Sequence, residues 1–197
     1  MPNNFKSTKN KSQQIHPVPP FVTNKILTDN QRQLLREGWP MHSFDNPVEV
    51  IPGIWLSGIA FDDDLPNWCH RNNFTHVLNA AGSYDKSFFY RTHPNTYNIK
   101  YLELNMDDNV GFELYPFLVP MYNFIEDVVR NNGKILVHCV WGQSRSVSCI
   151  IYYMMTKWKI TYNKALGIIK RVRSIAQPNN GFEAQLQAID RYKTHIM

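Results

Sequence analysis

Residues 134–158 read KILVHCVWGQSRSVSCIIYYMMTKW, and this stretch decides the fold. The short apolar run at 134–138 is typical of a strand that is buried on both faces. The sequence from residue 146 onward stays apolar for long enough to form a core helix. A buried strand that passes through a short loop into a core helix indicates a domain of the α/β class.

The segments on either side continue this alternation of strands and helices. Strands are predicted within residues 48–58 on both sides of Pro52-Gly53, around residues 77–78, and over residues 99–104. Helices are predicted over residues 62–73, 113–131, 161–174 and 182–196. We therefore predict a single α/β domain with a central, mostly parallel and twisted sheet that is flanked by helices.

The composition fits one folded domain with a polar extension. The chain has 197 residues, of which 43% are hydrophobic and 13% aromatic, and only 9 are glycine. These values exclude a collagen-like or fully disordered chain, and 3 cysteines are too few for a disulfide framework. The net charge of +5 permits binding to anions such as phosphoproteins, nucleic acid or acidic lipid, without choosing among them.

The sequence predicts neither a membrane segment nor a secretory leader. No stretch approaches the roughly 18 apolar residues that span a bilayer, and residues 1–14 are polar. We therefore expect no membrane partner and a cytoplasmic or nuclear location. In such a reducing compartment Cys69, Cys139 and Cys149 remain thiols.

The chain divides into three parts. Residues 1–26 contain lysines and prolines without periodicity, which predicts a flexible basic tail. Residues 27–47 predict a short helix, capped by Asp29 or Asn30, and a linker that pack as an arm against the domain. Residues 48–197 form the domain itself.

The loop between the buried strand and the core helix carries the chemistry. Its residues 138–146, HCVWGQSRS, place Gly142 between Cys139 and Arg145. Backbone N–H groups of such a loop point inward at a helix N-terminus and form a cradle for an anion. These donors and the Arg145 guanidinium favour a thiolate at Cys139, and the guanidinium can hold two phosphoryl oxygens. The spacing therefore predicts a phosphate site with a cysteine nucleophile.

Simpler interpretations explain this loop less well. Taken alone, Cys139 is typical of a small core residue and Arg145 of a solvated charge. A Walker-type loop needs the pattern Gly-x-x-x-x-Gly-Lys, which the sequence lacks. A papain-like pair of cysteine and histidine leaves the anion cradle without a purpose. The coincidence of strand, cysteine, glycine, arginine and helix favours the phosphate site.

The loop also resembles the signature of a known enzyme family. Residues 138–146 fit the pattern His-Cys-x-x-Gly-x-Ser-Arg-Ser of the cysteine-dependent dual-specificity protein phosphatases, within the protein tyrosine phosphatase superfamily. Supporting stretches in the family's order are IWLSG at 54–58, THVLNAAG at 75–82, LNMDDN at 104–109 and QPNNGFEAQL at 177–186. The resemblance covers residues 48–192. It implies a protein tyrosine phosphatase-like fold and makes residues 48–197 the catalytic domain.

The resemblance implies roles for individual residues of the loop. Cys139 attacks phosphorus to form a phosphocysteine, Arg145 binds the phosphoryl group, and Ser146 stabilises the thiolate as it leaves. His138 supports the cysteine from behind. The further phosphate-binding positions are Val140, Trp141, Gly142, Gln143 and Ser144. Neither a metal nor a cofactor is implied.

A carboxylic acid protonates the leaving oxygen in this family, and two residues compete for that role. Asp107 and Asp108 are adjacent, so only one of the two side chains can face the site. The family's spacing to the following helix favours Asp108.

Three other residues have structural interpretations. Cys149 is predicted to lie in the core, and Asn179 is predicted to cap the last helix. Arg173 is predicted to belong to the solvated face of the helix before it.

The loop composition favours a phosphoprotein substrate over a lipid. Val140, Trp141 and Gln143 are uncharged, whereas relatives that act on inositol phospholipids carry lysines in this loop. We expect hydrolysis of phosphotyrosine and of phosphoserine or phosphothreonine. Two alternatives remain open: an RNA 5′-phosphatase of the same superfamily, whose substrate the net charge would attract, and a catalytically silent module that binds phosphoprotein. The sequence predicts no oligomeric state.

Overall fold

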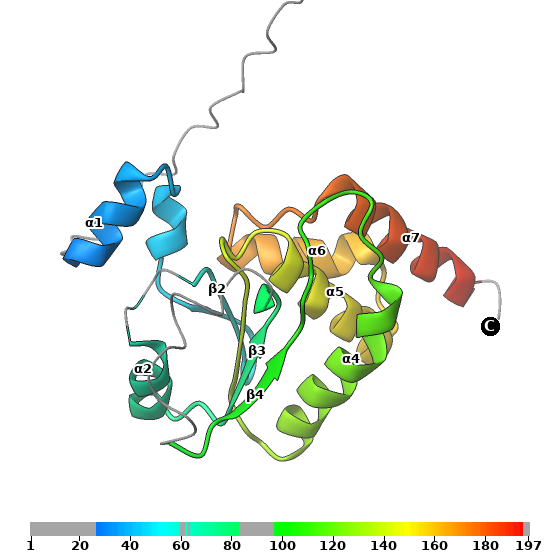
Figure 1. Ribbon diagram of the computed structural model, residues 1–197. Helices are drawn as coiled ribbons and strands as arrows, with labels where there is room; N and C mark the ends of the chain where they lie inside the picture. Colours follow the sequence, from blue (N-terminus) through cyan, green and yellow to red (C-terminus); the bar gives the residue numbers. More distant parts are fainter. Residues whose placement is uncertain (1–26, 60–61, 63, 83–96, 195–197) are drawn as a thin grey trace, which may run out of the picture.

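A computed structural model describes residues 27–59, 62, 64–82 and 97–194, in which strands and helices alternate as predicted (Figure 1). The basic tail predicted at residues 1–26 lies outside the described residues. The strands are β1 (Val48–Ile51), β2 (Ile54–Ser57), β3 (His76–Asn79), β4 (Lys100–Glu103) and β5 (Ile135–His138). The helices are α1 (Asp29–Arg36), the 3-10 helix η1 (Met41–Phe44), α2 (Leu65–Arg71), α4 (Tyr115–Arg130), α5 (Arg145–Trp158), α6 (Tyr162–Val172) and α7 (Asn180–Thr194).

The five strands form one mixed sheet in the order β1-β2-β5-β3-β4. Only β1 runs antiparallel to its neighbour β2, whereas β2, β5, β3 and β4 are parallel. The last residues of the three central strands are in register, because His138 pairs with both Ser57 and Asn79. Since parallel strands end at the same edge, the loops that follow them gather there. The loop that begins at Cys139 therefore lies at the middle of this edge.

Helices cover both faces of the sheet (Figure 1). Leu78 and Val137 point into the main core, which also contains apolar residues of α4, α5, α6 and α7. Their neighbours Val77 and Leu136 point to the opposite face and pack against α2. Side chains of a strand alternate between the two faces, so a strand with helices on both sides must be apolar throughout. This requirement explains the continuous apolar run that the sequence shows before Cys139.

The short N-terminal helix α1 has a different cap from the one predicted. Thr28, rather than Asp29 or Asn30, caps it, because the Thr28 hydroxyl accepts the Gln31 N–H at 3.2 Å while the Gln31 side chain accepts the Thr28 N–H at 3.1 Å. This reciprocal capping box satisfies two N–H groups at once, which a single aspartate cannot do. The helix and η1 share a small apolar cluster around Leu34 and Phe44, and Trp39 between them also packs against the main core.

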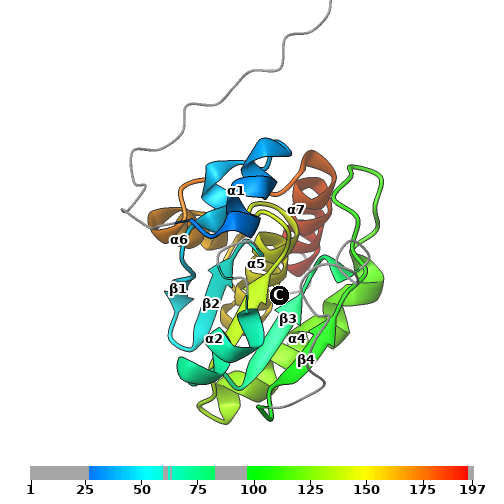
Figure 2. The same cartoon turned by 60° about the vertical axis from the view of Figure 1, so that its left-hand side comes forward.

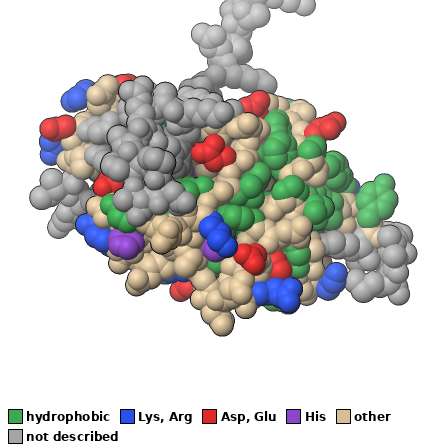
Figure 3. All heavy atoms as spheres, turned by 60° about the horizontal axis from the view of Figure 1, so that its bottom comes forward, with side chains coloured by type: hydrophobic (Ala, Val, Ile, Leu, Met, Phe, Trp, Pro, Cys, Tyr) green, Lys and Arg blue, Asp and Glu red, His purple; other side chains and the backbone are tan. Residues whose placement is uncertain are grey.

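The surface carries both apolar and charged side chains. Large apolar side chains that are exposed include Val110, Tyr115 and Val119. Figure 3 shows apolar side chains gathered on one side of the face seen there, with Lys, Arg, Asp and Glu side chains interspersed elsewhere. Within the described residues, no helix combines the length and the apolar character that crossing a membrane requires.

Candidate active site

The loop predicted to bind phosphate connects β5 to α5 at the edge of the sheet where the parallel strands end (Figure 2). Gly142 has a positive φ of 62°, a backbone conformation that residues with a Cβ rarely adopt. A Cβ built on it would lie 2.5 Å from the carbonyl carbon of Ser57. Both observations require glycine here, because the loop folds tightly against the end of β2.

Cys139 lies at the base of this loop and is only 1% exposed. Its Sγ accepts a hydrogen bond from the Gly142 N–H at 3.2 Å and lies 3.1 Å from Oγ of Ser146. These contacts fix the position of the sulfur. They also place the Ser146 hydroxyl where it can donate a hydrogen bond to a thiolate at Cys139, the role predicted for it.

His138 lies directly behind the cysteine and is fully buried. Burial is the main cause that lowers the pKa of its imidazole, to about 4, although a hydrogen bond with the backbone of Cys139 opposes the effect. The ring is therefore neutral at pH 7. This placement agrees with the predicted supporting role.

Arg145 begins α5 and is almost buried, with its guanidinium turned toward the segment after β4. Its Nε lies 3.4 Å from Oδ2 of Asp108, and its Nη1 donates to the Met106 carbonyl at 3.3 Å. The structure thus brings together the two ends of the predicted loop and one of the two predicted acids.

Asp108 is held by side chains from two other segments. Its Oδ1 accepts a hydrogen bond from the Ser144 hydroxyl at 2.6 Å and one from the Asn179 amide at 2.9 Å. The Asn179 N–H donates in turn to the Ser144 hydroxyl at 3.0 Å. Asn179 also caps α7, as predicted, by accepting the Phe182 N–H. The cap was predictable from the sequence, but the contact with the acid was not.

A pocket of about 450 Å³ opens over this loop. It is lined by Glu37, Gly38, Trp39, Asp107, Asp108, Val140, Trp141 and Arg145. Both candidate acids therefore face it. Among the described residues, no group of three histidine, cysteine, aspartate or glutamate side chains is placed to hold a metal ion, and a metal-free reaction remains a prediction.

A sequence model of the family described as dual specificity phosphatase, catalytic domain, matches residues 62–192. The chain belongs to the dual specificity phosphatase family. It is thus a protein phosphatase and a cysteine-dependent hydrolase, as the sequence predicted.

Individual relatives of this phosphatase agree with the family assignment. Dual specificity protein phosphatase 1 of Arabidopsis thaliana is 31% identical over 145 residues, which cover 74% of this chain and 69% of the relative. The crystal structure of human DUSP28 is similar with a TM-score of 0.64 and 25% identity, over 76% of this chain and 96% of that chain. A human tyrosine phosphatase-like serine/threonine/tyrosine-interacting protein reaches a TM-score of 0.65 and 25% identity, over 75% and 97% of the two chains.

The prediction that Arg173 is a solvated side chain is wrong. It is 4% exposed, and its guanidinium donates to the carbonyl groups of Gly142 (2.7 Å), Trp141 (3.0 Å) and His42 (3.2 Å). The helix α6 ends at Val172, so Arg173 adopts a non-helical conformation and turns inward. It therefore holds the loop between β5 and α5 in place through the carbonyl groups of that loop. The predicted helix extends to residue 174, so the periodic pattern does not signal this inward turn.

Cys149 lies where the sequence predicted, whereas the phosphate-binding roles of the remaining loop residues stay predictions. Val140 and Trp141 line the pocket, and the Gln143 carbonyl accepts the Gln177 N–H at 2.8 Å. The Ser144 side chain holds the acid. Cys149 is buried in the main core, where burial raises the pKa of its thiol, so it is a core residue as predicted.

Proposed function

We propose that this phosphatase removes phosphoryl groups from phosphotyrosine, phosphoserine and phosphothreonine in proteins through a phosphocysteine on Cys139. The observation that carries this proposal is the gathering of three groups around one loop: Arg145 and Asp108 line the pocket over it, and Cys139 lies buried at its base. These are the sulfur of Cys139, the guanidinium of Arg145 and the carboxyl group of Asp108. They are the nucleophile, the phosphoryl-binding cation and the acid that such a reaction needs.

In the first step, the thiolate of Cys139 attacks phosphorus in line with the bond to the leaving oxygen. The sulfur–phosphorus bond forms while the phosphorus–oxygen bond breaks, and Asp108 gives its proton to the leaving oxygen. Arg145 exchanges its contact with Asp108 for two phosphoryl oxygens. Backbone N–H groups of the loop stabilise the charge that develops on the same oxygens.

In the second step, water attacks phosphorus and transfers a proton to the Asp108 carboxylate. The sulfur–phosphorus bond breaks, inorganic phosphate leaves, and Cys139 returns to the thiolate. The Ser146 hydroxyl, 3.1 Å from the sulfur, donates to that thiolate as it forms. The step therefore regenerates both the nucleophile and the protonated acid.

Asp108 is the better candidate for the acid because other side chains fix its position. Ser144 and Asn179 both donate to Oδ1, which leaves Oδ2 directed toward Arg145 and the place of the phosphoryl group. Asp107 also lines the pocket, whereas Asp108 lies 3.4 Å from Nε of Arg145 in addition to its two donors. An acid acts efficiently only where its proton can reach the leaving oxygen.

The proposal can be tested with the purified full-length chain, an aryl phosphate and phosphopeptides, in the presence of a chelator. We expect turnover by the wild type, and a loss of at least about 10³-fold in Cys139→Ser. Intact-mass measurement after rapid acid quenching should show one added phosphoryl group in the wild type and none in the variant. Cys149→Ala is the matched control, because it removes a different buried thiol and should keep turnover once it is folded.

Two results would assign a different function. The fold alone does not separate hydrolysis from binding, since a phosphatase-like interacting protein shares it. A folded wild type that binds phosphopeptide without turnover would be a silent module. A higher kcat/KM for RNA with a 5′ triphosphate than for phosphopeptides would identify an RNA 5′-phosphatase.

A further inference from the structure

One wall of the active-site pocket comes from a segment far from the catalytic loop in sequence. Residues 37–39, here called the N-terminal wall, join α1 to η1 and line the pocket together with Arg145 and Asp108. They precede residues 62–192, which match the family. Figure 2 shows α1 and η1 lying over the same end of the sheet as the loop after β5. The wall therefore lies outside the stretch that the family model matches.

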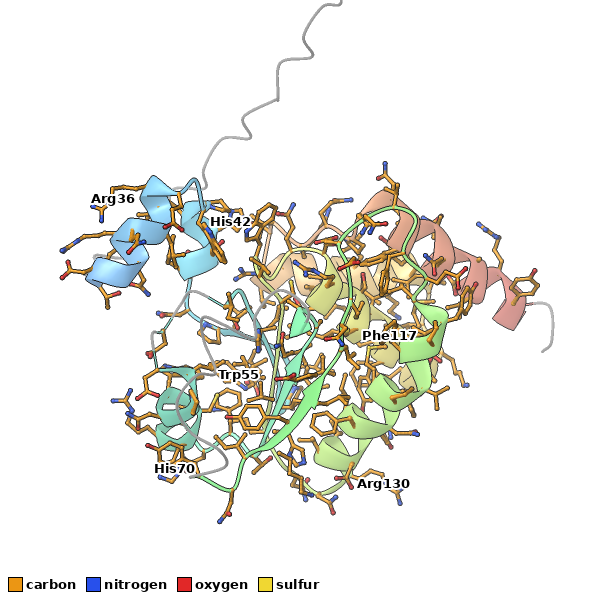
Figure 4. The ribbon with its side chains drawn as sticks, in the orientation of Figure 1. Arg36, His42, Trp55, His70, Phe117 and Arg130 are labelled. Atoms are coloured by element: carbon orange, nitrogen blue, oxygen red, sulfur yellow. The ribbon has the colours of Figure 1, made fainter. Side chains whose placement is uncertain are left out.

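The segment that carries the wall is attached to the catalytic loop at two places. Arg173 donates to the carbonyl of His42, which is labelled on η1 in Figure 4, and to the loop itself. At Gly58 the backbones come close together, since a Cβ there would lie 3.1 Å from the carbonyl oxygens of both Ser43 and Val140. These contacts hold η1 against the loop and keep the wall in place.

Trp39 anchors the wall itself. Its side chain is half-buried and packs against the main core as well as against Leu34 and Phe44. The backbone N–H of Trp39 donates to the Leu34 carbonyl at 3.0 Å. Because Trp39 is fixed on both sides, the adjacent Glu37 stays at the rim of the pocket.

The charge of the rim becomes negative once a phosphoryl group is bound. The bound phosphoryl group neutralises the charge of Arg145, and Asp108 transfers its proton to the leaving oxygen. Glu37 is exposed on the pocket, and its carboxylate accepts a hydrogen bond from the neutral Gln33 amide; within the described residues, no basic side chain forms an ion pair with it. Asp107 lines the same pocket. A cation beside the phosphorylated residue is attracted by such a rim, and a second anion is repelled.

We propose that Glu37 selects phosphoproteins that carry lysine or arginine next to the phosphorylated residue. This inference rests on the proposed function and names the substrates within it. Trp141, which is 46% exposed beside the rim, offers an aromatic face to the same cation or its aliphatic stem. The overall positive charge of the chain does not contradict this selectivity, because the local carboxylates act at shorter range than the screened net charge.

The test compares phosphotyrosine peptides that differ only in the flanking residues, which are arginine, alanine or glutamate. At low ionic strength we expect kcat/KM of the wild type to favour arginine over glutamate by about 3- to 20-fold. Glu37→Gln should reduce this ratio at least about 2-fold, and Glu37→Lys should reduce it further or invert it. Added salt should also reduce the ratio.

The matched control is Asp29→Asn, which makes the same change in charge on α1, the helix that ends just before Glu37. Asp29 is 99% exposed in its side chain and does not line the pocket. We expect this variant to keep the wild-type ratio of arginine to glutamate peptides. The dissociation constants of the same peptides for Cys139→Ser measure the preference separately from turnover.

The outcomes separate this inference from the proposed function. Hydrolysis of aryl phosphate and of all three peptides at equal efficiency would overturn the inference and keep the function. A preference that survives in both Glu37 variants would also overturn it. Loss of turnover with a retained preference in binding would overturn the function and keep the role of Glu37.

Discussion

Replacement of Arg173 tests whether the catalytic loop depends on a side chain outside its motif. The guanidinium donates three hydrogen bonds, to the carbonyl groups of Gly142, Trp141 and His42, from a site that is 4% exposed. Arg173→Met removes all three bonds. In Arg173→Lys a single ammonium replaces the planar fork and cannot reach three acceptors in the same geometry.

The cost follows from the number of bonds and from the burial of the charge. Hydrogen bonds to a charged group contribute about 1.5–3 kcal/mol each, and the cost of burying the guanidinium offsets part of the sum. We therefore expect Arg173→Met to lower the free energy of unfolding by about 2–5 kcal/mol. A shift of about 1 Å in the loop lowers kcat/KM by up to about 100-fold, and we expect about 10- to 100-fold in both variants.

The assay measures kcat/KM on an aryl phosphate together with the folded fraction at the same temperature, so that lost stability is not counted as lost activity. The matched control is Arg171→Met, because Arg171 is exposed in the last turn of α6, two residues before Arg173. It should change stability by less than about 0.5 kcal/mol and leave kcat/KM unchanged. Wild-type kcat/KM in a folded Arg173→Lys would refute the idea that Arg173 positions the loop.

Three further predictions concern the acid, the loop glycine and pH. Asp108→Asn should lower kcat far more than Asp107→Asn and abolish the basic limb of the pH–rate profile; equal effects in stopped-flow or steady-state kinetics would reject Asp108 as the acid. Gly142→Ala should destabilise the fold and the site, since its Cβ would lie 2.5 Å from the Ser57 backbone. Gly167→Ala should instead stabilise by up to about 1 kcal/mol in thermal unfolding, because its Cβ meets nothing within 4 Å. The pKa of His138 falls from about 6.5 in the unfolded chain to about 4 in the fold. The free energy of unfolding is therefore highest above pH 6.5, where the imidazole is neutral in both states. It decreases as pH falls toward 4, because the unfolded chain takes up the proton first. His138 should account for about 3 kcal/mol of the stability that urea unfolding shows to be lost over that range, beside the part from His42, whose pKa burial also lowers to about 4. The loss should be reduced in His138→Gln, and an unchanged pH dependence would contradict this origin.

The local patterns predicted the framework and the reactive loop. The apolar run before Cys139 indicated a doubly covered strand, and β5 is that strand. The spacing from Cys139 to Arg145 indicated a turn into a helix, which begins at Arg145. Such features depend on residues that are neighbours in sequence, so their periodicity and spacing are visible before folding.

The residues that support the site were not predictable in the same way. Arg173 binds backbone carbonyls more than thirty positions away, and Asn179 reaches Asp108 across 71 positions. Glu37 and Trp39 line the pocket only because η1 is held against the loop. Every residue has a backbone carbonyl, so the acceptors of Arg173 cannot be recognised from the sequence. The partner of a long-range contact is determined only by the folded arrangement.

The hydrogen bond between Asp108 and Asn179 means that the active site is complete only after the last helix has folded against the domain. The loop around Cys139 needs β5, α5 and Arg173 after α6, whereas the acid receives its second donor only when the start of α7 docks. A chain interrupted before α7 therefore holds a nucleophile without a fully positioned acid. Such a fragment would retain phosphorylated partners longer than the finished enzyme, and the rate of turnover reports how completely the chain has folded.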